Sequence, residues 1–541
     1  MSWLGRLALV ALLFAPFLGA ELAARAKSPE TGRASVVRSS ALTFALACGL
    51  SGRFFMQREA SRFDVDLPLW SQEHALHFTI DALNAPLLLL LTLLTLAISL
   101  GAPFTLLAPH KLRALLQLTA LNALLLVTVD LPVLGLGYCL VLLPIRQLAT
   151  RGSESAHRAA VARVFKLYHL LGLGCFVTAL VLFGYSVGPS HLLDLNILHL
   201  DTSAVPASLR PVLFTLFVVA VLVRTGVAPF HSWLPEALQH GSLLGVTFLM
   251  SMRTGMYLLA RLVIPAFPAE TMAAMPLLTS VALLSAVYGA IAAISQVDLR
   301  RMVGFLIVSQ SGIMLTGFVF ADEHAISGSL LYWLGFAVAT LGLVIMIAAL
   351  RTRTGTSDVR LLGGLVTRVP QLAAAFFLFG LATIAIPGTL AFAAEDMLIH
   401  GALEAHPLLT IVMAAAMVLN AITVVRSFAS TFLGQPSPHG AAQGLLDDLL
   451  PRERVVSVAL LVALISSGLY PQALIRAQGA AAHHIAEIVG PAAQADASLH
   501  QRQGARHIGA QNTCSVSSAS LQAPFLGSPP VRMICAASGS R

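Results

Sequence analysis

Long apolar runs are the feature that most constrains this chain. A helix needs about 20 apolar residues to cross the hydrocarbon core of a bilayer, and walking along the sequence gives about fourteen such runs. Clear examples are TIDALNAPLLLLLTLLTLAISL, LFTLFVVAVLVRTGVAPF and TSVALLSAVYGAIAAIS. Backbone polar groups inside a bilayer must be hydrogen-bonded within the chain, so these runs predict membrane-spanning helices. We therefore expect an all-α, polytopic membrane protein surrounded by lipid.

The composition agrees with a membrane protein. Of 541 residues, 57% are hydrophobic and only 11% are charged, whereas soluble domains carry about a quarter charged residues. The net charge of +8 does not indicate nucleic-acid binding, because many Lys and Arg residues lie in short gaps between apolar runs. The five cysteines include no CxxC motif and no His/Cys cluster, so they predict neither a metal site nor a disulfide framework.

The gaps between apolar runs alternate in charge. APHKLR, SQVDLRRM and RTRTGTSDVR are basic, whereas SRFDVDLPLWSQEH and ADEHA carry acids or histidines. Basic gaps face the cytoplasm, which predicts a multi-pass inner-membrane protein with both termini outside. The first apolar run, with small residues near Ala24 and Ala26, also fits a cleaved signal peptide. The basic gap that follows it favours a retained helix.

One arginine lies inside an apolar run, in VLVRTGVAPFHSWLPEALQHG. A charge at mid-bilayer costs about 2.5 to 3.5 kcal/mol, so Arg224 is expected to face protein or water and to mark a pathway. The alternative is an arginine near a helix end that reaches the interface. Gly226 and Pro229, with Pro235 beyond them, predict an interrupted helix, whose freed carbonyls need protein or water. This favours the pathway interpretation.

A second apolar run, LATIAIPGTLAFAAEDMLIHGAL, has Pro387 and Gly388 at its middle. Glu395 and Asp396 follow about two helical turns later. Two broken helices in corresponding positions indicate an inverted-repeat transporter with its ion or substrate site beside the breaks. Simple kinks in packed helices would explain the breaks but not the charges next to them.

Three further polar residues belong to this set. Arg253 lies in the apolar run LMSMRTGMYLLARL, between the two breaks. Glu236, at the end of the first broken helix, is a candidate partner for an arginine. His231 also lies at the first break, where a lone histidine is at least as often structural as it is a proton relay.

Four segments in a fixed order carry a family resemblance: APFHSWLPEAL, MRTGMYLLARL, YGAIAAISQVDLRRMVGFLIVSQSGIMLTGF and IPGTLAFAAEDML. They resemble the antiporter-like membrane subunits of respiratory complex I, most closely those of the subunit M type. The same family includes the large Mrp antiporter subunits and membrane subunits of energy-converting hydrogenases. The resemblance implies fourteen helices, with two inverted five-helix repeats that each contain a broken helix. It also implies a hydrated row of ionisable residues at mid-membrane.

Matched by motif, the family's functional residues fall on divergent side chains. The first lysine of the row corresponds to Arg224, the central lysine to Arg253, and the last ionisable residue to Glu395. The glutamate that accompanies the first lysine corresponds to Cys139, and a buried thiol does not replace a carboxylate at neutral pH. Arginine does not lose its proton in proteins, so neither arginine can relay protons by deprotonation.

The resemblance also suggests a division of the chain. Residues 1–74 are expected to hold the N-terminal helices and an outside loop, and residues 75–435 the antiporter-like core with its two repeats. Residues 436–477 would hold a loop and the last helix. From residue 478 to Arg541 the composition turns polar, and we expect a disordered tail.

Three functions remain open from the sequence. The first is a proton- or cation-translocating membrane subunit of an NADH-quinone oxidoreductase-like complex, driven by other membrane subunits and a soluble redox subunit. The second is a subunit for ion-driven bicarbonate or CO2 uptake with a soluble zinc-containing partner, and the third is a structural membrane module. No phosphate loop, nucleophile elbow or iron–sulfur motif occurs, so we expect a non-catalytic subunit without a cofactor of its own.

Overall fold

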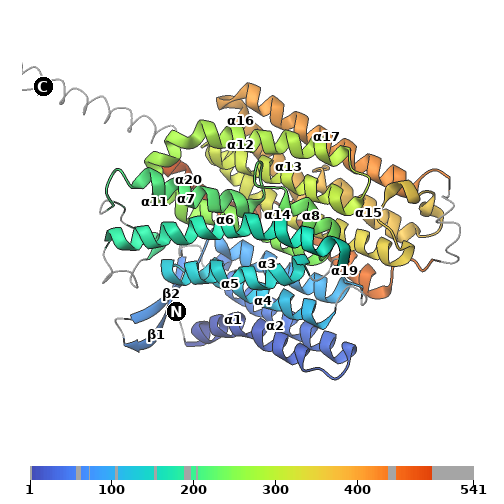
Figure 1. Cartoon of the computed structure of the whole chain (residues 1–541), viewed down its shortest axis with the longest axis horizontal. Helices are drawn as coiled ribbons and strands as arrows, with labels where there is room; N and C mark the ends of the chain where they lie inside the picture. The colour runs from blue at the N-terminus through green and yellow to red at the C-terminus, as the bar shows by residue number, and fades with distance from the viewer. Residues whose placement is uncertain are drawn as a thin grey trace, which may run out of the picture. The chain divides into compact units, whose positions relative to one another are not determined.

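Helices dominate the computed structural model of this chain (Figure 1), which describes residues 3–56, 62–71, 74–103, 108–150, 155–187, 196–200, 202, 205–435 and 446–489. In the described part of the chain, six helices precede the first predicted broken helix: α1 (Trp3–Ala24), α2 (Pro29–Met56), α3 (Asn84–Gly101), α4 (Pro109–Val127), α5 (Leu131–Thr150) and α6 (Ser155–Val187). A 3-10 turn, η3 (Ile197–His199), follows. In Figure 1, α1 and α2 lie at one side of the bundle, and α16 and α17 lie at the other.

The chain from residue 210 onward combines long helices with several short, interrupted ones. They are α7 (Arg210–Thr225), α8 (Trp233–His240), α9 (Leu243–Met252), α10 (Thr254–Leu258), the π-helical turn η4 (Leu259–Val263), α11 (Ile264–Ala266), α12 (Pro268–Ile294), α13 (Leu299–Val319) and α14 (Glu323–Thr354). After them come η5 (Val359–Leu361), η6 (Leu365–Thr367), α15 (Pro370–Thr383), α16 (Leu390–Ala405), α17 (Pro407–Phe432), α19 (Pro451–Leu469) and α20 (Gln472–Val489).

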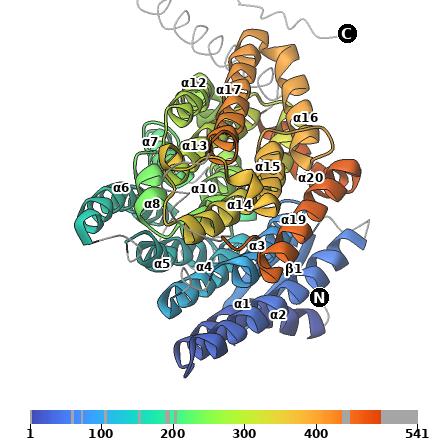
Figure 2. The same ribbon diagram turned by 90° about the vertical axis from the view of Figure 1, so that its right-hand side faces the viewer.

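Ten helices in the described part of the chain are long and apolar enough to cross a membrane, or eleven if the bent pair of α19 and α20 forms one span. This confirms a polytopic helical protein. The fourteen spans and the inverted repeats stay predictions. The most apolar windows of α13 and α14 are entirely buried, whereas that of α6 is only 28% buried. Figure 2 shows α14 between α3, α13 and α19. Helix α14 therefore lies near the centre of the bundle.

A β-hairpin departs from the all-α prediction. Strand β1 (Arg62–Ser71) pairs antiparallel with β2 (His74–Asp81). The run RFDVDLPLW alternates polar and apolar residues, the period-two pattern of a strand, which the count of long apolar runs overlooks. The backbone N–H of His77 donates to Asp130 Oδ2 at 2.7 Å, which ties the hairpin to the start of α5. The predicted division after residue 74 therefore cuts through a hairpin.

The last described helix departs from the predicted tail. Helix α20 bends away from α19 by 73°, and its residues Gln478, Ala482, Ile485 and Val489 are buried. A boundary at residue 478 therefore cuts a packed amphipathic helix. Figure 1 shows α20, α11 and the hairpin at the same end of the bundle. Residues 490–541 of the predicted tail, and residues 436–445 of the predicted loop, lie outside the described residues.

Candidate functional site at the helix breaks

The first predicted break is present between α7 and α8. Gly226 ends α7 with φ 71°, a left-handed conformation that glycine adopts without strain. The indole N–H of Trp233 donates to the Val223 carbonyl at 3.3 Å, which satisfies one of the groups that the break frees. Pro229 lies in the connecting loop, and Pro235 lies in the first turn of α8, where a missing N–H costs nothing.

Arg224 lies in the last turn of α7 and is only 3% exposed. Its guanidinium carbon lies 5.1 Å from the centre of the Tyr138 ring, a cation–π distance. None of its three nitrogens has a hydrogen-bond partner among the described residues, and no described carboxylate forms an ion pair with it. The structure thus places a buried, fixed positive charge on an aromatic face.

The prediction from the sequence did not identify the residues that surround Arg224. Tyr138 of α5 is 2% exposed and stacks on Phe176 at 4.1 Å. His169 of α6 is 5% exposed and lies within electrostatic reach of Arg224. The predicted Cys139 is only half-buried, and its neighbour Tyr138 is the residue that faces the arginine. Nothing in the sequence marks Tyr138 or His169, because α5, α6 and α7 meet only in the folded chain.

Arg253 occupies a third helix break, which the sequence did not predict. It joins α9 to α10 with φ 36° and ψ 50°, a left-handed conformation that costs a non-glycine residue about 1 to 3 kcal/mol. The residue is 1% exposed. Its Nη1 donates to Ser311 Oγ, and its guanidinium carbon lies 5.2 Å from the centre of the Phe336 ring.

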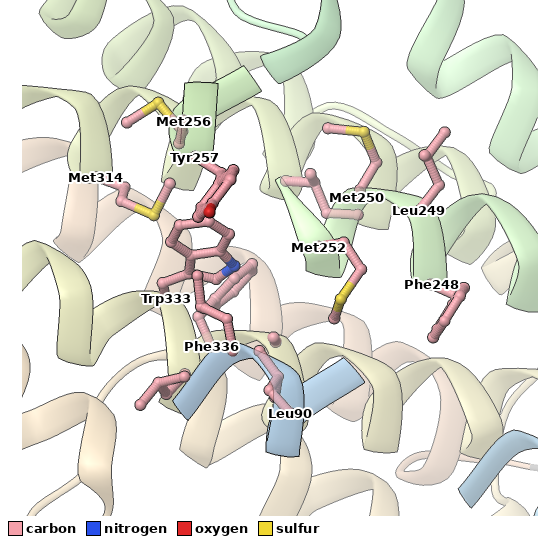
Figure 3. Packing of buried hydrophobic residues seen from close by; sticks show 14 of the residues in the cluster. Leu90, Phe248, Leu249, Met250, Met252, Met256, Tyr257, Met314, Trp333 and Phe336 are labelled. Carbon is pink, nitrogen blue, oxygen red and sulfur yellow. The ribbon is translucent and has the colours of Figure 1, made fainter. Parts of the chain in front are cut away.

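Sulfur and aromatic side chains enclose this third break. Figure 3 shows Met250 and Met252 at the end of α9, Met256 and Tyr257 on α10, and Trp333 and Phe336 on α14. All of these residues are buried. The Trp333 indole N–H donates to the Ser251 carbonyl at 2.8 Å, so a neighbouring side chain again satisfies backbone near a break.

The second predicted break is present between α15 and α16. Ala385 (φ 55°) and Gly388 (φ 96°) adopt left-handed conformations on either side of Pro387. The side-chain amide of Gln310 donates to the Thr383 carbonyl at 3.1 Å. At the first break the donor, Trp233, belongs to the second part of the broken helix, whereas Gln310 comes from another helix, α13. In both cases a side chain bonds a freed carbonyl, which is how a bundle interior tolerates such an interruption.

Glu395 lies in the second turn of α16 and is half-buried. Tyr332 of α14 is 1% exposed and lies within electrostatic reach of both Glu395 and Arg253. No described residue forms an ion pair with Glu395. The Tyr332 ring stacks at 5.8 Å on Phe336, the residue whose ring faces Arg253. The sequence did not single out this buried tyrosine.

Asp396 lies outside this group. Its side chain is 59% exposed and lies 3.4 Å from His400 on the same helix. Neighbouring positions on a helix point about 100° apart, so two successive acids cannot both face the same interior. Asp396 marks the outer face of α16.

Glu236 and His231 lie near the first break without approaching Arg224's aromatic surroundings. Glu236 forms the predicted pair with an arginine, since its Oε1 lies 3.3 Å from Arg301 Nη1. The His231 ring centre lies 4.9 Å from that of Tyr288 and 6.3 Å from that of Phe305. These aromatic contacts agree with a structural role for His231.

Comparison with known proteins now adds to this geometry. The family described as "NADH:quinone oxidoreductase/Mrp antiporter, TM" matches residues 128–423, more than half of the chain. The chain belongs to this family. All three helix breaks and every charged residue discussed above fall within the matched range. The metal-ligating residue types form no group of three or more within the described part of the chain.

Individual relatives lead to the same family. NADH-quinone oxidoreductase subunit M of Escherichia coli strain K12 is 26% identical over 328 residues, which cover 60% of this chain and 64% of that subunit. A chain of respiratory complex I from Thermus thermophilus with bound NADH has a TM-score of 0.78 at 24% identity, covering 89% of this chain and 100% of that one. A chain of the Mrp complex from Dietzia sp. DQ12-45-1b has a TM-score of 0.77 at 20% identity, covering 91% and 100%.

These comparisons establish what kind of molecule this family member is. It has the fold of the membrane subunits in those two complexes, and it is a multi-pass protein of the cell membrane. The structural neighbours are parts of multi-subunit membrane complexes, which supports other membrane subunits as its partners. The match spans 64% of the length of the E. coli subunit, so activity and cargo are matters for proposal.

Proposed function

We propose that this chain is a membrane subunit that conducts protons, or another small cation, as part of a larger complex. Three observations carry the proposal. The buried Arg253 lies 5.2 Å from the ring of Phe336 on α14, that ring stacks on Tyr332 at 5.8 Å, and Glu395 lies on α16, which packs against α14. An ionisable side chain inside a membrane bundle is costly and marks a pathway by default. Glu395 is the member of this group whose side chain can exist either as a carboxylate or as a protonated acid.

Each member of the group has a separate task in this proposal. Glu395 accepts and releases the proton. Tyr332 has a hydroxyl that can both donate and accept a hydrogen bond, so it can connect Glu395 to the centre of the bundle. Arg253 keeps its charge throughout, so it contributes a fixed positive field to the centre of the bundle. The proton therefore passes near the fixed charge of Arg253, and the guanidinium does not itself take up or release it.

The first half does not supply an equivalent path. Arg224 faces the Tyr138 ring instead of a carboxylate, and a guanidinium does not deprotonate in proteins. Cys139, at the position of the family's glutamate, carries no charge at neutral pH when it lies in apolar surroundings. We therefore assign conduction to the second half and an electrostatic role to Arg224.

Partners and orientation follow from the same proposal. Other membrane subunits, and a soluble redox subunit, would supply the driving reaction. Under the positive-inside rule, the ends of α4, α13 and α14 that carry Lys111, Arg300 and Arg351 face the cytoplasm, and both chain termini lie outside. In this orientation the hairpin and α20 lie on the outer side.

Inorganic-carbon uptake is a second candidate, carried by a single observation. Arg224 is buried without a hydrogen-bond partner among the described residues, and a fixed positive charge suits bicarbonate. The Tyr138 ring, however, lies 5.1 Å from the same guanidinium and already provides it with a cation–π contact. A soluble zinc-containing partner and a purely structural role remain predictions from the sequence.

The test uses the protein extracted with its partners and reconstituted into vesicles. A potassium diffusion potential drives inward proton movement, and a pH-sensitive dye inside the vesicles reports it. Glu395→Gln should reduce the flux at least about tenfold, because positioned proton-transfer groups contribute two or more orders of magnitude. Replacing potassium with sodium gradients in the same assay identifies the conducted cation.

Asp396→Asn is the matched control. It changes the next residue on the same helix by the same chemistry, but its side chain lies on the outer face. The flux should stay within about twofold of the wild type, as for a surface substitution away from the path. Equal proton flux in the wild type and in Glu395→Gln would show that the proposed path by way of Glu395 is wrong.

A further inference from the structure

A small cavity lies at the end of the bundle that we propose faces the cytoplasm. Its volume is about 60 Å³, and its walls come from α3, α4, α5, α13, α14 and the junction between α8 and α9. Three of the residues that line it are cationic: Lys111 of α4, Arg300 of α13 and Arg351 of α14. None of the lining residues is acidic. Three positive charges therefore share one small space without a neutralising carboxylate in its walls.

Arg300 is the most deeply buried of the three, at 4% exposed. Its Nη2 donates to the Gly241 carbonyl at 2.6 Å, whereas its Nε has no partner among the described residues. A buried guanidinium that retains an unused donor is costly unless something else accepts that hydrogen bond.

Asp298, the residue directly before α13, already has hydrogen-bond partners for both of its carboxylate oxygens. Asp298 Oδ1 accepts from the backbone N–H groups of Arg300 and Arg301 at 2.9 and 3.1 Å. Its Oδ2 accepts from the Ser357 hydroxyl at 2.7 Å. This carboxylate caps the start of α13. Within the described part of the chain, no carboxylate forms an ion pair with any of the three cations that line the cavity.

A helix N-terminus adds to the positive field. Helix α9 begins at Leu243, and Gly241, Ser242, Leu243 and Gly245 all line the cavity. The first backbone N–H groups of a helix have no acceptor within the helix, and the helix dipole favours an anion in front of them. The Gly245 N–H donates to the Ser242 hydroxyl at 3.4 Å, and the Ser242 N–H donates to the Leu148 carbonyl at 2.9 Å. Among the described residues, the N–H groups of Leu243 and Leu244 remain for an anion.

We propose that this cavity binds a phosphate group. Three cations, an unused buried donor and free backbone N–H groups are the partners that phosphate oxygens prefer. A water molecule needs about 10 to 15 Å³ in the same measure of volume, so 60 Å³ accommodates an ion of a few heavy atoms. The group can come from a phospholipid headgroup at the membrane surface or from free phosphate.

The position of this phosphate site gives it a structural consequence. Arg300 holds the Gly241 carbonyl, which lies between α8, the second part of the first broken helix, and α9. Helix α9 leads from the cavity to Arg253 at the centre of the bundle. A bound phosphate would neutralise the repulsion among the three cations and hold this junction together.

The first arm of the test measures free phosphate. The full-length protein is purified in detergent, depleted of lipid, and titrated with inorganic phosphate at constant ionic strength. The thermal unfolding midpoint, followed by tryptophan fluorescence, should rise saturably. Lys111→Gln and Arg351→Gln should each weaken half-saturation at least about tenfold, the loss expected for one charged hydrogen-bond donor. These two half-buried residues are chosen because Arg300 also supports the Gly241 carbonyl.

Arg113→Gln is the matched control for Lys111→Gln. It removes a cation two residues further along α4, but Arg113 is 44% exposed and pairs with Glu21 at 2.6 Å. Its half-saturation should match that of the wild type. An equal weakening in Arg113→Gln would show a general charge effect and overturn the site.

The second arm measures lipid. Native mass spectrometry counts phosphatidylglycerol molecules that stay bound to the wild type and to the Lys111→Gln/Arg351→Gln double variant. A headgroup in the cavity predicts one lipid fewer on the variant and release of that lipid by added phosphate. Free phosphate as the ligand predicts equal lipid counts with the titration effect preserved. If neither the phosphate titration nor the lipid count separates variant from wild type, the proposal is wrong.

Discussion

The two predicted helix breaks share an architecture but differ in chemistry. At each break a freed carbonyl accepts from a side chain outside the helix before it: Val223 from Trp233 and Thr383 from Gln310. Beside the first break, Arg224 lies on an aromatic ring without an acid. Beside the second, Glu395 lies on α16, which packs against the helix that carries Tyr332. The backbone interruption can therefore persist after the titratable residues beside it have changed.

The difference also separates two kinds of charge. A carboxylate changes its charge when it takes up a proton, so it can alternate between states during transport. A guanidinium keeps its charge at every physiological pH and can act only through its field or its hydrogen bonds. The comparison predicts that the halves respond differently to the same kind of substitution.

Two buried tyrosines provide the largest expected contrast. Tyr332→Phe removes the hydroxyl that we place between Arg253 and Glu395, and we expect proton flux in reconstituted vesicles to fall about tenfold. Tyr138→Phe keeps the ring that faces Arg224 and loses only a 3.4 Å hydrogen bond to the Ala220 carbonyl. Its flux should stay within about twofold of the wild type. A larger loss in Tyr138→Phe than in Tyr332→Phe would reverse the assignment of the halves.

The two central arginines should differ in what they contribute to stability. Arg253→Met removes a charged hydrogen bond to Ser311, and we expect the free energy of unfolding to fall by about 1.5 to 3 kcal/mol. Arg224→Met removes a buried charge that has no hydrogen-bond partner among the described residues. The variant no longer carries the cost of desolvating a buried charge, which offsets the lost cation–π contact with Tyr138. We therefore expect little change, or a gain, in the free energy of unfolding.

Unfolding in mixed micelles with increasing denaturing detergent would measure both arginine variants against the wild type. Arg224→Lys serves as a control, because it keeps a charge while losing the planar group that packs on Tyr138. If Arg224→Met lowered the free energy of unfolding as much as Arg253→Met, Arg224 would have a stabilising partner other than Tyr138.

The donors at the breaks should have smaller and local effects. Gln310→Leu leaves the Thr383 carbonyl unsatisfied, and Trp233→Phe does the same for Val223. Each should cost about 1 to 3 kcal/mol of local stability, as a buried group without its partner does. Hydrogen exchange should accelerate at residues 384–389 in the first variant and at residues 226–232 in the second. Acceleration at both breaks in either variant would show that the breaks are coupled.

The sequence predicted the features that depend on local chemistry. Glycine and proline at Gly226, Pro387 and Gly388 locate two breaks, because these residues limit the backbone wherever they occur. The burial of Arg224 follows from the apolar run around it. The pairing of Glu236 with an arginine was also correct in kind.

Features that depend on distant contacts escaped prediction. Tyr138 and Tyr332 acquire their roles only when α5 meets α7 and α14 meets α16. The left-handed conformation of Arg253 has no residue signal of its own. It is accompanied by close packing of Gly255, where an added Cβ would lie 2.3 Å from Thr225 Oγ1. Tertiary contact thus holds the backbone where local preference would not.

A surface pair gives the smallest expected effect and a baseline for pH experiments on either half. Asp358 lies in the loop between α14 and α15, and its hydrogen bonds from Arg360 lower the pKa of its carboxyl below the ordinary 3.8. A lowered folded-state pKa stabilises the protein above the unfolded value, and this contribution disappears as pH falls through the folded pKa. Asp358→Asn should therefore cost a small, constant amount of stability from pH 5 to 8 and nothing at about pH 2 or below.

Thermal unfolding of wild type and Asp358→Asn across that pH range checks this expectation. If the difference between the two proteins is flat from pH 5 to 8, the loop contributes no pH dependence there. A change of proton flux over the same range that is lost in Glu395→Gln would then be assigned to the second half. A sloping difference would instead place a titrating group in the loop and weaken that assignment.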